Sequence, residues 1–186
     1  EMHRAVDNKG RKLPPSQWNS VEAIAISERS LAFAKSDSII TLMEMRTWIV
    51  ISTLTRASPA SVMKFSPSGH LLAIGEARDR GGRIIIMDTG DGKILKEMKR
   101  KGDINCLAFS WDGRYLGVAD ASGRVSILFL EPPSHDLLYK ACVTKLVSPA
   151  AAATVVSFGS DNRFMAYGDS SGRVVVVVVD SWTEIY

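Results

Sequence analysis

The sequence has few of the residues that build metal sites and disulfide frameworks. Its 186 residues include two cysteines and three histidines. Two cysteines do not make a disulfide framework, and no Cys-x-x-Cys pair indicates a zinc site. The histidines are scattered through polar or turn segments, so we expect them at the surface without a bound metal. The low cysteine content is typical of a reducing compartment.

Long apolar runs are also missing. The longest is the six valines Val174–Val179, far short of the ~20 residues that a membrane-spanning helix needs. The first 12 residues are polar and lack the hydrophobic core of a secretory signal. We therefore expect a cytoplasmic protein that makes no contact with a membrane. Because the chain begins with Glu1 rather than Met, we also expect it to be part of something longer.

No segment carries the sustained apolar stripe of an amphipathic helix. What the sequence has instead is short runs rich in Val, Ile, Leu and Phe, separated by Gly, Asp, Asn and Ser. Such runs and turn residues are typical of strands joined by tight hairpins. The sequence predicts an all-β protein.

One strand–turn–strand unit recurs along the chain. The segment VMKFSPSGHLLAIGE is similar to CLAFSWDGRYLGVAD, to VVSFGSDNRFMAYGD and, more faintly, to AIAISERSLAFAKSD. The anchor residues Phe65, Phe109 and Phe158 are 44 and 49 residues apart. Each unit is followed by a third apolar run, which begins at Ser38, Gly82, Gly123 or Gly172.

Strand triplets at this spacing predict β-propeller blades of four antiparallel strands. We expect about four blades, at approximately 20–58, 59–101, 102–150 and 151–186. Residues 1–19 would be an N-terminal arm or the end of a preceding blade. The fourth strands are predicted at Trp48–Leu54, Ile94–Lys99, Leu137–Val143 and Trp182–Tyr186.

At these residues the chain resembles the WD-repeat family. FSPSG at Phe65 and FSWDG at Phe109 are similar to that family's first turn, and SGRVSIL and MDTGDGKIL to its later turns and strands. The resemblance covers about residues 20–186 and implies a scaffold for protein–protein interactions, with no enzymatic activity and no cofactor. The family usually closes a ring of seven blades. We therefore expect a larger propeller, completed by another segment or by a partner.

The repeats are degenerate. The position of the family's Trp is taken by Met43, Met87, Leu128 and Val177. The family's Gly-His pair is missing, and Arg56 and Arg100 fall near the position of that His. Its turn aspartate is matched by Asp37, Asp120 and Asp169. Because the His partner is absent, we expect that the hydrogen-bonded network that braces such blades is not formed.

The stretch GEARDRGG, residues 75–82, has two interpretations. A phosphate-binding loop needs its glycines before a helix N-terminus, whereas here the strand-like run RIIIM follows. The spacing also fits neither phosphate-binding glycine motif. We interpret the stretch as a lengthened hairpin turn, three residues longer than in sister repeats, and as a loop that contacts a partner through Glu76, Arg78, Asp79 and Arg80.

This lengthened turn is similar to turns in microtubule-associated and ciliary WD-repeat proteins, which favours a cytoskeletal or ciliary assembly. The alternative is a translation- or RNA-associated propeller. Its basis is the basic segment 93–101, in which Lys99, Arg100 and Lys101 are candidate contacts. No aromatic residue is interleaved in this segment, so a base-stacking platform is not indicated. The overall net charge of +3 does not by itself indicate nucleic acid.

Trp111 occupies a turn position that usually takes Pro or a polar residue. Two interpretations stay open: packing between blades, or an exposed anchor for a protein partner. No nucleophile motif and no converging polar cluster indicates catalysis, so we expect that the protein is not an enzyme.

Overall fold

The structure is a computed structural model of the chain, and it describes residues 20–77, 81–130, 146–147 and 151–185. Sixteen strands and no helix make up the regular structure of these residues. They form four antiparallel sheets of four strands each. The all-β prediction is confirmed, and the number of sheets agrees with the expected number of blades.

The sheets are numbered here in chain order. Sheet 1 contains β1 (Val21–Ile26), β2 (Ser30–Lys35), β3 (Ile39–Glu44) and β4 (Val50–Thr55). Sheet 2 contains β5 (Ala60–Phe65), β6 (Leu71–Glu76), β7 (Arg83–Asp88) and β8 (Ile94–Lys99). Sheet 3 contains β9 (Ile104–Phe109), β10 (Tyr115–Asp120), β11 (Arg124–Phe129) and β12 (Leu146–Val147). Sheet 4 contains β13 (Ala153–Phe158), β14 (Phe164–Asp169), β15 (Val174–Val178) and β16 (Thr183–Glu184).

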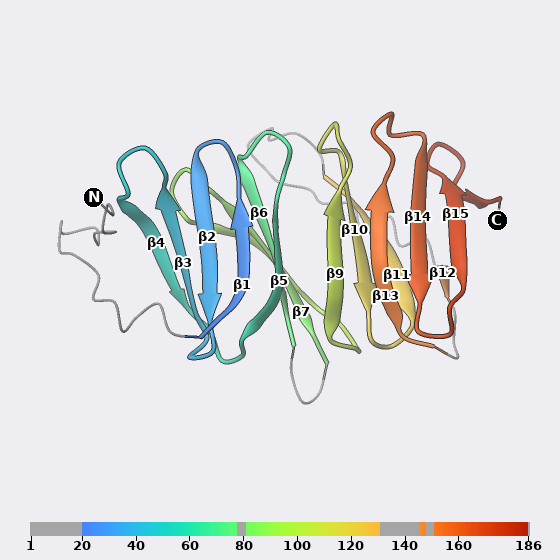
Figure 1. The fold of residues 1–186 in the computed structure, drawn as a ribbon, viewed down its shortest axis with the longest axis horizontal. Coiled ribbons are helices and arrows are strands. Elements are labelled where there is room, and N and C mark those ends of the chain that lie inside the picture. The colour runs from blue at the N-terminus through green and yellow to red at the C-terminus, as the bar shows by residue number, and fades with distance from the viewer. Residues whose placement is uncertain (1–19, 78–80, 131–145, 148–150, 186) are drawn as a thin grey trace.

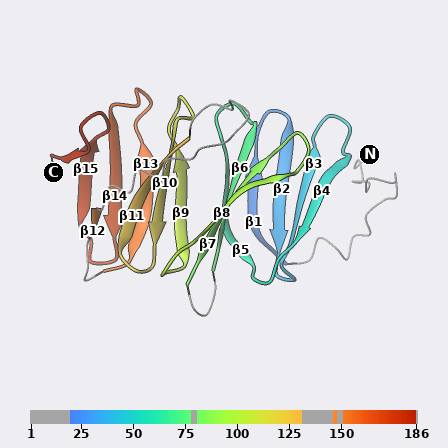
Figure 2. The ribbon, with the colours of Figure 1, turned by 180° about the vertical axis from the view of Figure 1, so that it is seen from behind.

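The sheets stand side by side in chain order, with sheet 1 and sheet 4 at opposite ends of the row (Figures 1 and 2). The first strands of consecutive sheets are neighbours, so that β5 lies between β1 and β9, and β9 lies between β5 and β13. Three apolar cores fill the spaces between the sheets. The two inner sheets are therefore covered on both faces, which is why their central strands are apolar at almost every position.

The run of valines illustrates this covering. Five of them form β15, which pairs with β14 on one side and β16 on the other. Val175 and Val177 face sheet 3 and are buried. Central pairing also satisfies the backbone groups that an apolar strand would otherwise expose.

Every first strand has a β-bulge at the same place in the repeat. The register shifts around Glu22, Ser61, Asn105 and Thr154. Ser61 Oγ lies 2.8 Å from the carbonyl oxygen of Ile104, and Asn105 Nδ2 donates to the carbonyl oxygen of Ala153 over 2.7 Å. In sheets 2 and 3 the bulge therefore turns a polar side chain toward the next sheet, where it ties one first strand to the following one.

The predicted fourth strands are partly corrected. β8 has the predicted bounds, but β4 and β16 begin after Trp48 and Trp182. Both tryptophans have positive φ, 58° and 53°, and their amides donate to the carbonyl oxygens of Glu44 and Val178. They thus close the turn before the strand, where sheet 2 has Gly92 at φ 74°. The predicted strand Leu137–Val143 lies outside the described residues, and sheet 3 has β12 at Leu146–Val147.

In the described part of the chain, no helix is long and apolar enough to cross a lipid bilayer.

Candidate functional site

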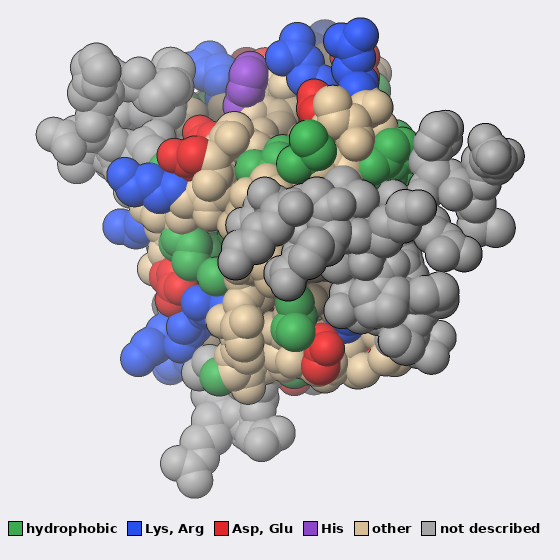
Figure 3. Space-filling view, turned by 90° about the vertical axis from the view of Figure 1, so that its left-hand side faces the viewer, with side chains coloured by type: hydrophobic (Ala, Val, Ile, Leu, Met, Phe, Trp, Pro, Cys, Tyr) green, Lys and Arg blue, Asp and Glu red, His purple; other side chains and the backbone are tan. Residues whose placement is uncertain are grey.

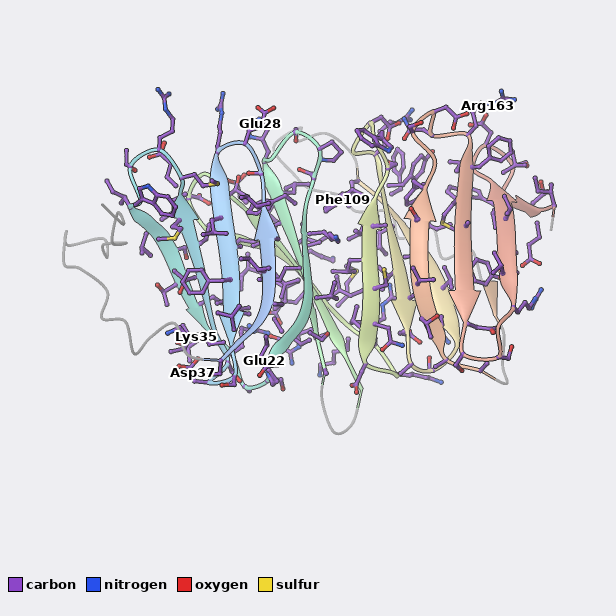
Figure 4. All side chains as sticks on the ribbon, in the orientation of Figure 1. Glu22, Glu28, Lys35, Asp37, Phe109 and Arg163 are labelled. Atoms are coloured by element: carbon purple, nitrogen blue, oxygen red, sulfur yellow. The ribbon has the colours of Figure 1, made fainter. Side chains whose placement is uncertain are left out.

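Trp111 is the most exposed aromatic side chain among the described residues, with 64% of its surface accessible. It lies in the turn between β9 and β10, at the end of the sheets where Figure 4 labels Glu28, Phe109 and Arg163. We call this the upper end, as it is drawn in Figure 1. This exposure excludes the interpretation that Trp111 packs between sheets, and it leaves the interpretation that Trp111 is an exposed anchor.

Hydrogen bonds hold the Trp111 turn in one geometry. Ser110 Oγ donates to Asp112 Oδ1 over 2.6 Å, and the Arg114 amide donates to the same oxygen over 3.0 Å. Gly113 takes the positive φ of 72° that the turn requires. The Trp111 amide donates to Asn162 Oδ1 of the next sheet over 2.7 Å. The indole is therefore presented from a braced turn, which lowers the entropy cost of binding through it.

Aromatic rings and arginines support the same region. The Tyr115 ring lies 5.5 Å from that of Phe129 and 5.3 Å from that of Trp182. The Arg114 guanidinium lies 5.6 Å from the centre of the Phe129 ring, and Arg114 is itself exposed. Trp and Arg are the residue types that most often dominate binding energy at protein interfaces.

The upper end is also hollowed between sheets 1 and 2. A shallow groove of about 430 Å³ runs between their turns, and its walls carry Arg29, His70 and Asp88. Charges of both signs line this groove, so it does not select for one sign of ligand charge.

The lengthened turn is a hairpin, as predicted, because β6 and β7 pair antiparallel up to Glu76 opposite Arg83. Its glycines have a steric role. Gly81 has a φ of 112°, and a Cβ there would lie 2.3 Å from the carbonyl oxygen of Arg100. Gly82 exchanges backbone hydrogen bonds with Arg100 and Gly102. The glycines let the turn close onto the segment after β8.

The expectation that Glu76 contacts a partner is wrong. Its side chain is fully buried, because it ends β6 between two arginines. Arg56 Nε, after the last strand of sheet 1, donates to Glu76 Oε1 over 2.7 Å, and Arg83 Nε lies 3.9 Å from Glu76 Oε2. The neighbouring candidates Arg78, Asp79 and Arg80 lie outside the described residues.

Glu97 on β8 completes a four-residue ion cluster. Both arginines donate to its carboxylate, Arg56 and Arg83 each over 2.8 Å. Burial by itself raises the pKa of Glu97, but the hydrogen bond from Arg56 and the charges of both arginines outweigh it and lower the pKa. Burial by itself lowers the pKa of Arg56, yet its bonds to Glu76 and Glu97 raise the pKa on balance. The charged forms of Arg56 and Glu97 are therefore favoured, and the cluster joins sheet 1 to sheet 2.

Arg100 is not part of an exposed basic surface either. Its guanidinium donates to Ser126 Oγ in sheet 3 over 3.0 Å. Burial lowers the pKa of Arg100, and the negative charge of Asp120 offsets this only in part. Lys99 and Lys101, by contrast, are exposed, as are Lys93 and Lys96. We call these four lysines the basic strip; Lys96 and Lys99 lie on β8, and Lys93 and Lys101 flank it.

Arg56 and Arg100 have equivalent positions in consecutive repeats. They are 44 residues apart, and so are the acids that they face, Glu76 and Asp120. Arg56 donates a hydrogen bond to Glu76, at the end of the second strand of the next sheet. Arg100, by contrast, interacts with Asp120, at the equivalent position, only through charge and donates its hydrogen bond to Ser126. The absence of the family's histidine-based network stays a prediction, while the Arg56–Glu76 bond joins sheets 1 and 2 without a histidine. The equal spacing of 44 residues, between the two arginines and between the two acids, is the feature of the sequence that could have indicated their equivalence.

Among the described residues, no group of three or more His, Cys, Asp or Glu side chains is placed to hold a metal ion. No protein-family model matches the sequence, and a search of curated proteins finds no match.

Proposed function

We propose that this chain is a non-enzymatic scaffold for protein–protein interactions, built from WD-repeat-like propeller blades, and that it works in the cytoplasm. The observation that carries the proposal is Trp111: a 64%-exposed indole on a turn that hydrogen bonds to the side chains of Ser110, Asp112 and Asn162 hold in place. An exposed Trp costs solubility, and a braced one is suited to insert into a pocket on a partner. The assembly that we favour is a cytoskeletal, microtubule or ciliary one.

The proposal is tested by replacing Trp111 with the photo-crosslinking amino acid benzoylphenylalanine. In a cell extract, we expect discrete adducts that an excess of unlabelled wild-type protein suppresses and an excess of Trp111→Ala does not. The same crosslinker at Thr55, an exposed position on β4, serves as the matched control. Equal adduct patterns at positions 111 and 55 would contradict the proposal.

The favoured assembly has a direct test of its own. The wild-type chain is sedimented with polymerised tubulin, beside the Trp111→Ala variant. We expect the wild type in the pellet and the variant largely in the supernatant. A wild-type chain that stays in the supernatant removes microtubules as the partner, and the crosslinking result then stands without them.

The basic strip supports a second candidate function, an RNA-associated scaffold. Its four lysines are exposed, Lys96 and Lys99 on β8 and Lys93 and Lys101 beside its ends, so they could meet phosphates. A gel-shift assay with single-stranded RNA tests this function, using Lys96→Glu combined with Lys99→Glu. RNA binding would weaken log-linearly with salt, and the double variant would lower the salt slope by about two.

A further inference from the structure

The two ends of the row of sheets expose the residues whose counterparts are buried between sheets. In sheets 2, 3 and 4 the middle position of the first strand is Met63, Leu107 or Val156, and each is at most 3% exposed. The equivalent residue of sheet 1 is Ile24, which is 65% exposed. Sheet 1 therefore exposes the face through which sheets 2, 3 and 4 each pack against the sheet before them.

The other end of the row shows the converse. The residue two places after the start of each third run is Ile40, Ile84, Val125 or Val174. The first three are at most 1% exposed, because the next sheet covers them, whereas Val174 is 56% exposed. Val155, whose counterparts Val62 and Cys106 pack against the following sheet, is 50% exposed. Sheet 4 therefore exposes the face through which sheets 1, 2 and 3 each pack against the sheet after them.

The strand residues that form the exposed face of sheet 4 are uncharged, and the Arg163 guanidinium lies 5.7 Å from the centre of the Phe164 ring. Strand register places on this face the residues Val155, Ser157, Phe164, Ala166, Gly168, Val174, Val176 and Val178. Packing another sheet on these strands would bury no charged strand residue. Apart from Phe164 these side chains are small or β-branched, whereas the corresponding faces of sheets 1 and 2 also carry Leu42, Leu71 and Met98.

Along β1, the exposed face of sheet 1 is apolar at the positions that are apolar in sheets 2 to 4. Ile24 and Ile26 on β1 are each 65% exposed, and the positions equivalent to Ile26 are Phe65, Phe109 and Phe158. Figure 3, which looks at this end, shows hydrophobic side chains on it in separate places. Phe33 and Met43 on the same face are already buried, so the exposed part lies along β1. At the three existing interfaces the first strand contributes Met63 and Phe65, Leu107 and Phe109, or Val156 and Phe158. Ile24 and Ile26 are the apolar residues at these positions of sheet 1.

From these two faces we infer that a second copy of this chain packs head to tail, sheet 4 of one copy on sheet 1 of the other. The occupant is a second copy because both complementary faces are on one chain and continue its own inter-sheet packing. β13 of one copy would then neighbour β1 of the other, as β9 neighbours β13 within the chain. Two such contacts join two copies into a ring of twice four sheets, which is within the range of about four to eight blades of closed propellers.

The bulge residues predict a specific contact at this junction. Ser61 and Asn105 each bond to the carbonyl oxygen of the residue just before the bulge residue of the next sheet, Ile104 or Ala153. The equivalent residue of sheet 4 is Thr154, whose hydroxyl donates within its own sheet to the carbonyl oxygen of Gly168. In the ring, Thr154 of one copy lies beside the carbonyl of Val21 of the other.

The inference is tested by the mass of the full chain in solution, by sedimentation velocity over a micromolar concentration series. We expect a dimer. Val155→Lys with Val174→Lys alters only the sheet 4 face, and Ile24→Lys with Ile26→Lys only the sheet 1 face. Each double variant should raise the dissociation constant at least about a hundredfold, because a lysine would be buried without a partner.

Mixing the two double variants distinguishes head-to-tail packing from any symmetric contact. In the mixture one junction carries all the lysines and the other is wild type, so a fluorescently labelled pair regains energy transfer that neither variant shows alone. In a symmetric sheet 4 contact, the sheet 1 variant would stay dimeric and the two variants would not associate with each other. That result overturns the inference, as does a wild-type monomer or an open polymer.

The controls show that the variants fold. All four substituted residues are at least half exposed, so circular dichroism and thermal unfolding should match the wild type. Ile49→Lys changes an isoleucine of similar exposure, 47%, which lines the groove between sheets 1 and 2 rather than an end face, and it should stay dimeric. The inference does not rest on the interaction surface at Trp111, so the two proposals fail independently.

Discussion

Arg56 Nε donates a hydrogen bond to Glu76 Oε1 over 2.7 Å, and this bond joins sheet 1 to sheet 2. The carboxylate is fully buried and the arginine side chain is 11% exposed. A buried charge keeps a partner because its desolvation is otherwise uncompensated. The pair therefore holds two sheets at one spacing and one register, which an apolar core alone specifies less tightly.

Arg56→Met should destabilise the protein strongly. It leaves Glu76 buried with only Arg83 at 3.9 Å, and removing one member of a buried ion pair costs about 3 kcal/mol of unfolding free energy. Urea denaturation measures the change. Arg173→Met is the matched control, because the Arg173–Glu184 pair is on the surface with both side chains over 40% exposed and should contribute less than about 1 kcal/mol. Equal effects of the two substitutions would contradict the role of the cluster.

Glu97 should make stability sensitive to acid. Its folded-state pKa is lowered below the ordinary value of 4.5, so the unfolded state takes up its proton first as the pH falls. The stabilisation is complete above pH 4.5 and is lost as the pH falls through the folded pKa. Glu97→Gln should lower stability at neutral pH and flatten the slope of unfolding free energy below pH 4.5. A slope that is unchanged in the variant would show that Glu97 is not linked to folding.

Gly81→Ala should distort the base of the lengthened turn. The new Cβ would meet the carbonyl oxygen of Arg100 at 2.3 Å, at a φ of 112°, and we expect a loss of about 2–3 kcal/mol. Gly172→Ala provides the comparison, because that glycine has a φ of 89° but no atom within 4 Å of the added Cβ. It should lose only about 1 kcal/mol. Thermal unfolding of both variants separates the steric contribution from the conformational one.

Trp111→Ala should separate binding from stability. The side chain is 64% exposed, so the unfolding free energy should change by less than about 0.5 kcal/mol. Affinity for a crosslinked partner, once isolated, should fall at least about 30-fold, as at interface hot spots. Isothermal titration calorimetry gives the affinity. A variant that loses stability but keeps its affinity would assign Trp111 to the fold.

The strands and hairpins were predictable because their causes are local. Alternating apolar residues and the turn residues around Gly69 and Gly113 specify each hairpin within about a dozen residues, and β8 begins and ends where predicted. The two misplaced strand starts have a local cause of another kind. Trp48 and Trp182 have the left-handed conformation that sheet 2 gives to Gly92, and tryptophan does not signal this conformation in a sequence.

The sequence alone determined the fold class, the four-strand unit and its repetition, because these follow from side-chain alternation and turn chemistry between near neighbours. Only the tertiary structure decided which charges are buried. Glu76 and Arg100 look like surface residues beside a polar turn, but they meet Arg56 and Ser126, which are 20 and 26 residues away in neighbouring sheets. Burial of a charge depends on what packs across it. Val125 and Val174 differ in exposure for the same reason. They occupy the same position of the repeat, but a following sheet covers Val125, and none covers Val174.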